Sequence, residues 1–144
     1  MSDPAVRALD RVTVALLVVA GGIAGTLCRY GMGQVFPAVE GWPLATLLVN
    51  VTGAFTLGLL VERLAAHDPG SARLQNLRLF AGTGFLGSYT TYSSLAVEAE
   101  RLLASDAYVT GIGYVLVSPF SGLVACLCGI AIGSRPWART RGAR

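Results

Sequence analysis

The chain contains one segment in which glycines and hydroxyl side chains interrupt a long apolar run: Gly84-Phe85-Leu86-Gly87-Ser88-Tyr89-Thr90-Thr91-Tyr92-Ser93-Ser94. Two glycines ahead of a Thr-Thr pair weaken a helix. Irregular backbone is tolerated at membrane depth only where protein or an aqueous cavity surrounds it. We therefore expect a membrane helix to unwind here, at Gly87–Thr90, and a bound cation is one way to satisfy the freed carbonyls. A merely polar, kinked packing helix is the weaker interpretation.

The composition indicates a membrane protein. The chain has 144 residues, of which 53% are hydrophobic and 13% charged, and its mean hydropathy is +0.61. Soluble domains carry about twice that charged fraction, and so small a domain cannot bury this much apolar surface internally. We expect a single domain over residues 1–144, since no long polar linker is present.

Apolar runs predict an all-α protein with four transmembrane helices joined by short polar loops. Each run is close to the 20 or so residues that a helix needs to cross the hydrocarbon. Glycines spaced four apart in the first and fourth runs predict close helix packing. The cysteines Cys28, Cys126 and Cys128 lie in apolar runs and are interpreted as small buried side chains. The predicted spans are Val12–Met32, Leu44–Val61, Leu77–Val97 and Tyr108–Ile132.

Basic residues gather on one side of this predicted bundle. With four spans, both termini and the loop between the second and third spans share a side. The opposite side has Arg101, and also Arg29 if it reaches that end. Basic residues that flank spans stay in the cytoplasm, so we expect cytoplasmic termini and a basic cytoplasmic tail over residues 135–144. The arginines on the shared side are Arg7, Arg11, Arg63, Arg73, Arg78, Arg135, Arg139, Arg141 and Arg144.

Two polar residues within the spans and one just beyond the third span are candidates for function, because such residues are costly in lipid. Arg29 either snorkels to the interface or serves a site, and its position favours neither. Asn50 either holds helices together, the commoner role of a lone amide, or faces a polar pathway. Glu98 lies one helical turn beyond Ser94 and is expected to face the same side.

Three motifs, in this order in a four-span chain, resemble the CrcB (Fluc) family of fluoride channels over nearly the whole sequence. Each alone is moderately specific, and the three together are highly specific. They are Gly21-Gly22-Ile23-Ala24-Gly25-Thr26-Leu27-Cys28-Arg29-Tyr30, Ala45-Thr46-Leu47-Leu48-Val49-Asn50-Val51-Thr52-Gly53, and Gly84 through Ser94 followed by Glu98.

The resemblance implies a plasma-membrane channel that lowers cytoplasmic fluoride by passive efflux. Members form antiparallel dimers with two narrow pores, and backbone carbonyls that match Gly87 and Thr90 hold a central sodium ion. Asn50 matches the pore-lining amide, Arg29 a basic residue near the vestibule, and Glu98 an acidic residue beyond the polar track. Tyr114 and Ser118 match further polar pore groups more loosely. The expected pore residues are Arg29, Asn50, Thr91, Tyr92, Ser94, Glu98, Tyr114 and Ser118.

The sequence departs from the family pattern at two aromatic positions. Where the family has two phenylalanines, this chain has Tyr92 and Leu95. Leu95 has no ring to offer an anion, and the arginine bias opposes insertion of one chain in both orientations. We therefore hypothesise pairing with a related, oppositely oriented subunit that supplies the missing rings.

Two other classes of membrane protein remain as alternatives. A small four-span drug–proton antiporter needs a carboxylate in its first span, and residues 12–32 contain none. A non-conducting structural membrane subunit would tolerate the altered aromatic positions. We expect no enzymatic activity, because the sequence shows no nucleophile–base constellation or metal cluster, and no nucleic-acid partner.

Overall fold

The computed structural model describes residues 11–39, 41–65 and 71–135, and within these ranges the regular elements are all helices. The predicted arginines Arg7, Arg139, Arg141 and Arg144 lie outside the described residues. The helices are α1 (Arg11–Val35), α2 (Leu44–Ala65), α3 (Ala72–Leu77), η1 (Arg78–Leu86), α4 (Gly87–Tyr89), α5 (Tyr92–Ala104) and α6 (Tyr108–Gly133).

Three of these helices are long and apolar enough to cross a membrane. They are α1 with 25 residues, α2 with 22 and α6 with 26. Each contains one of the predicted spans and extends it by a few residues at one or both ends. The remaining predicted span, Leu77–Val97, lies within the consecutive pieces α3, η1, α4 and α5, so no single piece has the length of a membrane helix.

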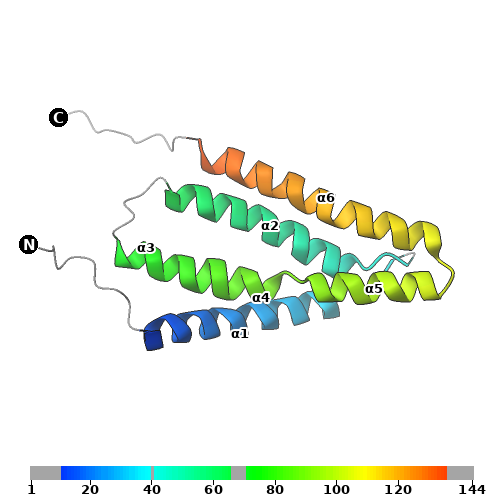
Figure 1. The fold of residues 1–144 in the computed structure, drawn as a ribbon, viewed down its shortest axis with the longest axis horizontal. Coiled ribbons are helices and arrows are strands. Elements are labelled where there is room, and N and C mark those ends of the chain that lie inside the picture. Colours follow the sequence, from blue (N-terminus) through cyan, green and yellow to red (C-terminus); the bar gives the residue numbers. More distant parts are fainter. Residues whose placement is uncertain (1–10, 40, 66–70, 136–144) are drawn as a thin grey trace, which may run out of the picture.

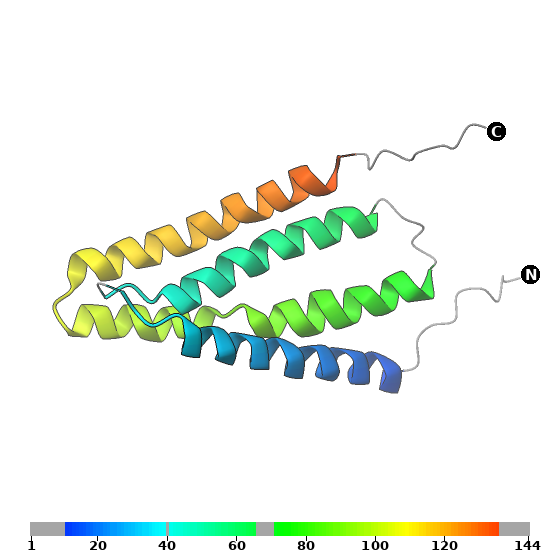
Figure 2. The ribbon, with the colours of Figure 1, turned by 180° about the vertical axis from the view of Figure 1, so that it is seen from behind.

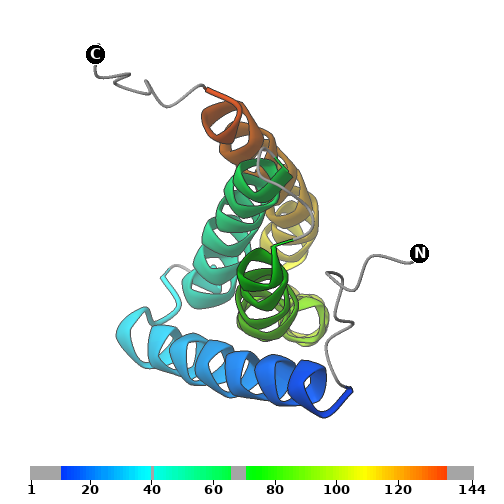
Figure 3. The same ribbon diagram turned by 90° about the vertical axis from the view of Figure 1, so that its left-hand side faces the viewer.

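The helices run side by side, and the interrupted one lies in the middle. Figure 1 shows α6 beside α2, then the rod formed by α3 to α5, and then α1. The opposite view in Figure 2 shows the same order. Viewed end-on, α1 crosses the interrupted rod at an angle, while α2 and α6 pack along each other (Figure 3). The rod therefore contacts helices on both sides.

Arginines mark one end of this bundle, as the sequence predicts. The start of α1, the end of α2, the start of α3 and the end of α6 meet at that end (Figure 1). It has the described arginines Arg11, Arg63, Arg73, Arg78 and Arg135. Arg29 and Arg101 belong to the opposite half of the molecule, toward the ends of α1 and α5.

Glycines allow α1 to approach η1 closely. A methyl group at Gly21 would overlap the Phe80 carbonyl oxygen, and one at Gly84 would lie 2.6 Å from the Val18 carbonyl oxygen. Close backbone approach of this kind is a main source of helix association in lipid. The contact fixes the N-terminal half of the interrupted helix against α1.

The interruption itself lies at Thr90 and Thr91. Thr90 has φ −75° and ψ 158°, and Thr91 has φ −152° and ψ 127°, so both residues are extended. The break was predicted for Gly87–Thr90, but Gly87–Tyr89 is helical. The prediction was therefore wrong about where the break begins. Glycine permits a break without requiring one, whereas the contacts described below hold Thr91 extended.

The wider turns of η1 precede this break. Residues 78–86 form a π-helix, whose N–H groups bond carbonyls five residues back and which in proteins is frequently found at functional sites. The short helix α4 follows, and α5 resumes after the break. The third predicted span thus contains a π-helical segment, a short α-helix, an extended break and the start of another α-helix.

Candidate functional site

Asn50 of α2 stabilises the extended backbone at the break. Its Nδ2 donates to the Thr91 carbonyl at 2.9 Å, and its Oδ1 accepts from the Thr91 N–H at 2.8 Å. One amide side chain thus satisfies both backbone groups of an extended residue, as a neighbouring β-strand would. Of the two roles considered for Asn50, it performs helix bridging, and its second N–H remains as a donor.

Thr91 also begins α5. Its Oγ1 accepts from the Ser94 N–H at 3.1 Å, which is the bond of an N-capping residue. The same oxygen lies 3.2 Å from the hydroxyls of both Ser93 and Ser94. The hydroxyl run therefore has a structural use, since it caps the new helix and links neighbouring hydroxyls into a chain.

The break also leaves main-chain carbonyls without helical donors in the residues that precede it. The Thr90 N–H still bonds the Leu86 carbonyl at 3.1 Å, so the helix ends there. The carbonyls of residues 87–90 have lost the donors that a continuing helix would supply. Gly87 is exposed, and a methyl group there would meet nothing within 4 Å. The main chain at Gly87 is therefore not covered by another part of the described protein.

A cavity of about 510 Å³ adjoins the break. It lies between α2, the interrupted helix and α6. Ser118, 3% exposed, contributes to its wall from α6. Four of the eight residues predicted for the anion path meet here, and the lining includes Asn50, Gly87, Thr90, Thr91, Tyr92, Leu95 and Ser118.

The two aromatic positions that depart from the family pattern differ in their surroundings. Tyr92 is 81% exposed and projects from the break. Leu95 is 8% exposed and packs with Ala99 and Tyr114 in the buried core. An apolar side chain thus occupies the position where the resemblance expects a second ring.

Glu98 is held by hydroxyl groups from two other helices. Thr46 of α2 donates to Oε1 and Tyr114 of α6 donates to Oε2, each at 2.7 Å. Tyr114 is fully buried, and its ring meets Trp42 edge-on with centroids 6.2 Å apart. Tyr114 therefore reaches the site as a donor to Glu98 and does not line either cavity.

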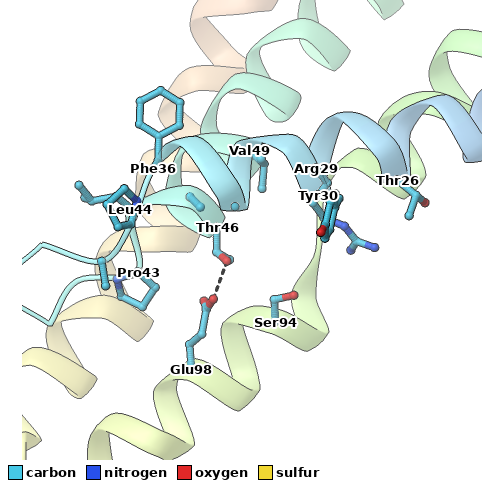
Figure 4. Close-up of a pocket in the computed structure, with 14 residues that line it drawn as sticks. Thr26, Arg29, Tyr30, Phe36, Pro43, Leu44, Thr46, Val49, Ser94 and Glu98 are labelled. Carbon is cyan, nitrogen blue, oxygen red and sulfur yellow. Dashed lines mark hydrogen bonds between the residues drawn. The ribbon is translucent and has the colours of Figure 1, made fainter.

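A second cleft, of about 500 Å³, opens beside Glu98. Arg29 of α1, Thr46 of α2, and Ser94 and Glu98 of α5 surround it (Figure 4). Ser94 and Glu98 share this cleft, as their spacing predicts. Ser94 also bonds Thr91 at the break, so it lies between the two cavities.

The structure therefore separates the predicted residues into two connected groups. Asn50, Thr91, Tyr92 and Ser118 lie by the break, whereas Arg29 and Glu98 lie by the cleft. Ser94 connects the two groups through its bond with Thr91. Tyr114 lines neither cavity but donates a hydrogen bond to Glu98.

Sequence reasoning missed Thr46 as a site residue, although it lies within one of the quoted motifs. It precedes Asn50 by four residues and hence shares its helix face. That spacing was the available signal, and it places the hydroxyl of Thr46 toward Glu98.

Comparison with known proteins identifies relatives over most of the chain. A family model described as CrcB-like protein, Camphor Resistance (CrcB), matches residues 16–130. The fluoride-specific ion channel FluC 2 of Leifsonia xyli is 42% identical over 119 residues, which cover 83% of this chain and 82% of the relative.

Two further relatives have similar names. The fluoride-specific ion channel FluC 3 of Streptomyces avermitilis is 40% identical over 92% of this chain and 64% of its own length. The fluoride-specific ion channel FluC 1 of Cutibacterium acnes is 41% identical over 79% of this chain and 81% of its own length.

Proposed function

Because the chain belongs to the CrcB-like family of membrane proteins, we propose that it is a subunit of a fluoride-selective channel that lowers cytoplasmic fluoride by passive efflux. The observation that carries the proposal is the break at Thr90–Thr91, bridged by Asn50 and bordered by hydroxyl groups. The names of its relatives, at 40–42% identity, support the choice of anion.

The residues around the break suit a dehydrated fluoride ion. Fluoride is small and strongly hydrated, so a selective pore must replace its water with other donors. The second N–H of Asn50 and the hydroxyls of Ser94 and Ser118 are such donors. The exposed ring of Tyr92 offers an electropositive edge. Together they can supply the coordination that the ion loses on leaving water.

A sodium ion fits the carbonyls at the break. Backbone oxygens suit a hard cation, and broken membrane helices use them in this way. Gly87 is open to the outside, and Thr90 is extended, so the main chain is accessible there. We assign the cation to the carbonyls of Gly87 and Thr90, where its charge would raise the local potential for an anion.

The arginines support one orientation of this chain in the membrane. The end with Arg11, Arg63, Arg73, Arg78 and Arg135 would face the cytoplasm. An inside-negative membrane potential then drives fluoride outward, at about 2.3 kcal/mol per 100 mV for each charge. Fluoride enters acidified cells as neutral HF and dissociates inside, so a passive outward path protects the cell.

The partner in this channel would be a related subunit of opposite orientation, in an antiparallel dimer. Leu95 is buried in the core and supplies no ring, while Gly87 and the ring of Tyr92 are exposed and could face a neighbour. The arginine bias opposes dual insertion of this chain. Rapid fluoride-selective efflux from liposomes that contain this chain alone would refute the requirement for a second kind of subunit.

A growth assay tests the proposed function in the cell. Deleting the gene from its own host should increase the sensitivity of growth to fluoride, most strongly in mildly acidic medium, where HF enters. Restoring the gene should restore resistance, whereas a copy that encodes Asn50→Ala should not. Equal growth of the deleted and restored strains at every fluoride concentration would contradict the proposal.

A further inference from the structure

A second arginine, Arg101, lines another cleft that Glu98 borders. Arg101 lines a shallow cleft of about 270 Å³ together with Ser93, Ser94, Val97 and Glu98. This cleft shares Ser94 and Glu98 with the larger one that Arg29 lines. Figure 4 shows the larger cleft with Arg29, Ser94 and Glu98 around it. Glu98 thus lines two clefts, and each cleft has one arginine among its lining residues.

Helix geometry explains why Arg101 belongs to this group. Ser94, Glu98 and Arg101 are spaced four and three residues apart on α5, so they share one face. Along that face the order runs from the break, through the carboxylate, to an exposed guanidinium near the helix end. Glu100 is adjacent in sequence but about 100° around the helix, and it lines neither cleft.

Neither guanidinium is neutralised by Glu98. The two oxygens of Glu98 accept from Thr46 and Tyr114. Among the described residues, the side chains of Arg29 and Arg101 have no hydrogen bond or ion pair. Two guanidinium groups therefore border clefts that also contain one carboxylate, whose oxygens already accept from Thr46 and Tyr114. The net potential at this mouth favours an anion, although a carboxylate is present.

We propose that Arg101, together with Arg29, forms an anion-collecting mouth that offsets the repulsion from Glu98 and raises the rate at which fluoride reaches Ser94. This inference rests on the proposed channel function. Arg101 acts through its charge and binds no ion tightly, so its contribution falls as salt screens it. The Debye length shrinks from about 30 Å at 0.01 M salt to about 3 Å at 1 M.

The test measures fluoride efflux from zwitterionic liposomes at low and high ionic strength. The channel is purified through a tag on this chain, together with any subunit that accompanies it. Arg101→Gln should lower the initial rate about three- to tenfold at low salt and by less than about 1.5-fold at high salt. Arg101→Lys keeps the charge and should retain the rate. Glu100→Gln should change it little, because Glu100 lies off this face.

Other outcomes separate this inference from the proposed function. If the wild-type channel conducts fluoride and Arg101→Gln matches it at low salt, the mouth is refuted while the channel function stands. An equal loss in Arg101→Gln and Arg101→Lys at both salt concentrations would indicate a packing or lipid-anchoring role and refute it too. If Arg101→Gln lowers the initial efflux rate at low salt and Glu100→Gln raises it by the same factor, the effect comes from general surface charge, and the inference is also refuted. Absence of efflux in the wild type would overturn both proposals.

Discussion

At the scale of single residues, a few polar side chains decide the geometry of the site. The side chain of Asn50 bonds the N–H and C=O of Thr91, which would bond other backbone groups in a continuous helix. Glu98 accepts from Thr46 and Tyr114 and so connects α5 with α2 and α6. An unpaired backbone group at membrane depth costs several kcal/mol. The two bonds from Asn50 remove that cost for the N–H and C=O of Thr91 and so stabilise its extended conformation. One amide side chain from a neighbouring helix thus compensates for the two backbone hydrogen bonds that Thr91 loses at the break.

The amide of Asn50 gives a direct prediction. Asn50→Ala removes two bonds and leaves the N–H and C=O of Thr91 unpaired, so the free energy of unfolding should fall by about 1–3 kcal/mol. Fluoride efflux should fall at least about tenfold, which corresponds to about 1.4 kcal/mol in the barrier. Chemical unfolding in detergent and efflux from liposomes measure the two effects.

The matched control is Thr56→Val on the same helix. The Thr56 hydroxyl is exposed and donates to the Thr52 carbonyl one turn earlier. Its loss leaves no buried group unpaired, so stability should change by less than about 0.5 kcal/mol. An Asn50→Ala variant that is as stable and as conductive as Thr56→Val would show that the amide does not hold the break.

The hydroxyls on Glu98 can be tested by a double-mutant cycle. Thr46→Val and Tyr114→Phe each remove one donor to the carboxylate. Buried hydrogen bonds in membrane proteins average about 0.6 kcal/mol and reach about 1.7, so each variant should lose stability in that range. Because both donors hold one carboxylate, the effects should be non-additive by about 0.5 kcal/mol or more. Strict additivity would show that the two donors act independently of each other and would contradict coupling through Glu98.

At the scale of elements, close contacts between backbones position the break. Gly21 and Gly84 bring α1 against η1, and Gly53 of α2 lies against the Thr90 side chain, which a methyl group at Gly53 would overlap. The interrupted helix is therefore held from both sides near its weak point. The position of the break depends on this packing as well as on the intrinsic weakness of the sequence.

Gly21→Val should separate α1 from η1. The side chain would overlap the Phe80 carbonyl oxygen, and overpacking typically costs about 1–3 kcal/mol. The midpoint of thermal unfolding in detergent should fall accordingly. Gly31→Ala on the same helix is the control, because a methyl group there meets nothing within 4 Å. Its midpoint should stay the same or rise slightly, and equal losses in both variants would contradict the packing argument.

The sequence predicted the long helices more accurately than the position of the break in the third span. Apolar runs located α1, α2 and α6 to within a few residues, because lipid demands a fixed length of apolar helix. The hydroxyl run correctly indicated a break, but Gly87 was expected to start it and is helical. The difference arises because Asn50, 41 residues away, selects Thr91 as the extended residue. Contacts across such a separation have no local signature.

At the scale of the whole molecule, apolar side chains cover the long helices and arginines are distributed unevenly between the two ends. The long helices leave large apolar side chains exposed, including Leu16, Val19, Leu116 and Leu127. The described arginines gather at one end, and Arg29 and Arg101 belong to the other half. The grouping of arginines followed from the sequence, whereas the bonds from Thr46 and Tyr114 to Glu98 required the assembled bundle.

The predicted orientation has its own test. In a variant whose native Cys28, Cys126 and Cys128 are replaced by serine, Gln34→Cys should react with a membrane-impermeant maleimide applied to intact cells. Gln34 is exposed near the end of α1, opposite the arginine-rich end. Ser71→Cys, at the start of α3, should react only after the cells are opened. The reverse pattern would place the arginine-rich end outside, against the charge rule.

The most direct measurement of the central claim is anion efflux from liposomes that contain the channel, purified through a tag on this chain with any accompanying subunit. After valinomycin makes the vesicles permeable to potassium, a fluoride electrode should record rapid fluoride release, whereas chloride-loaded vesicles should retain their chloride. Asn50→Ala should abolish most of the fluoride release. Fluoride release no faster than from protein-free vesicles, or chloride release as rapid as that of fluoride, would contradict the account.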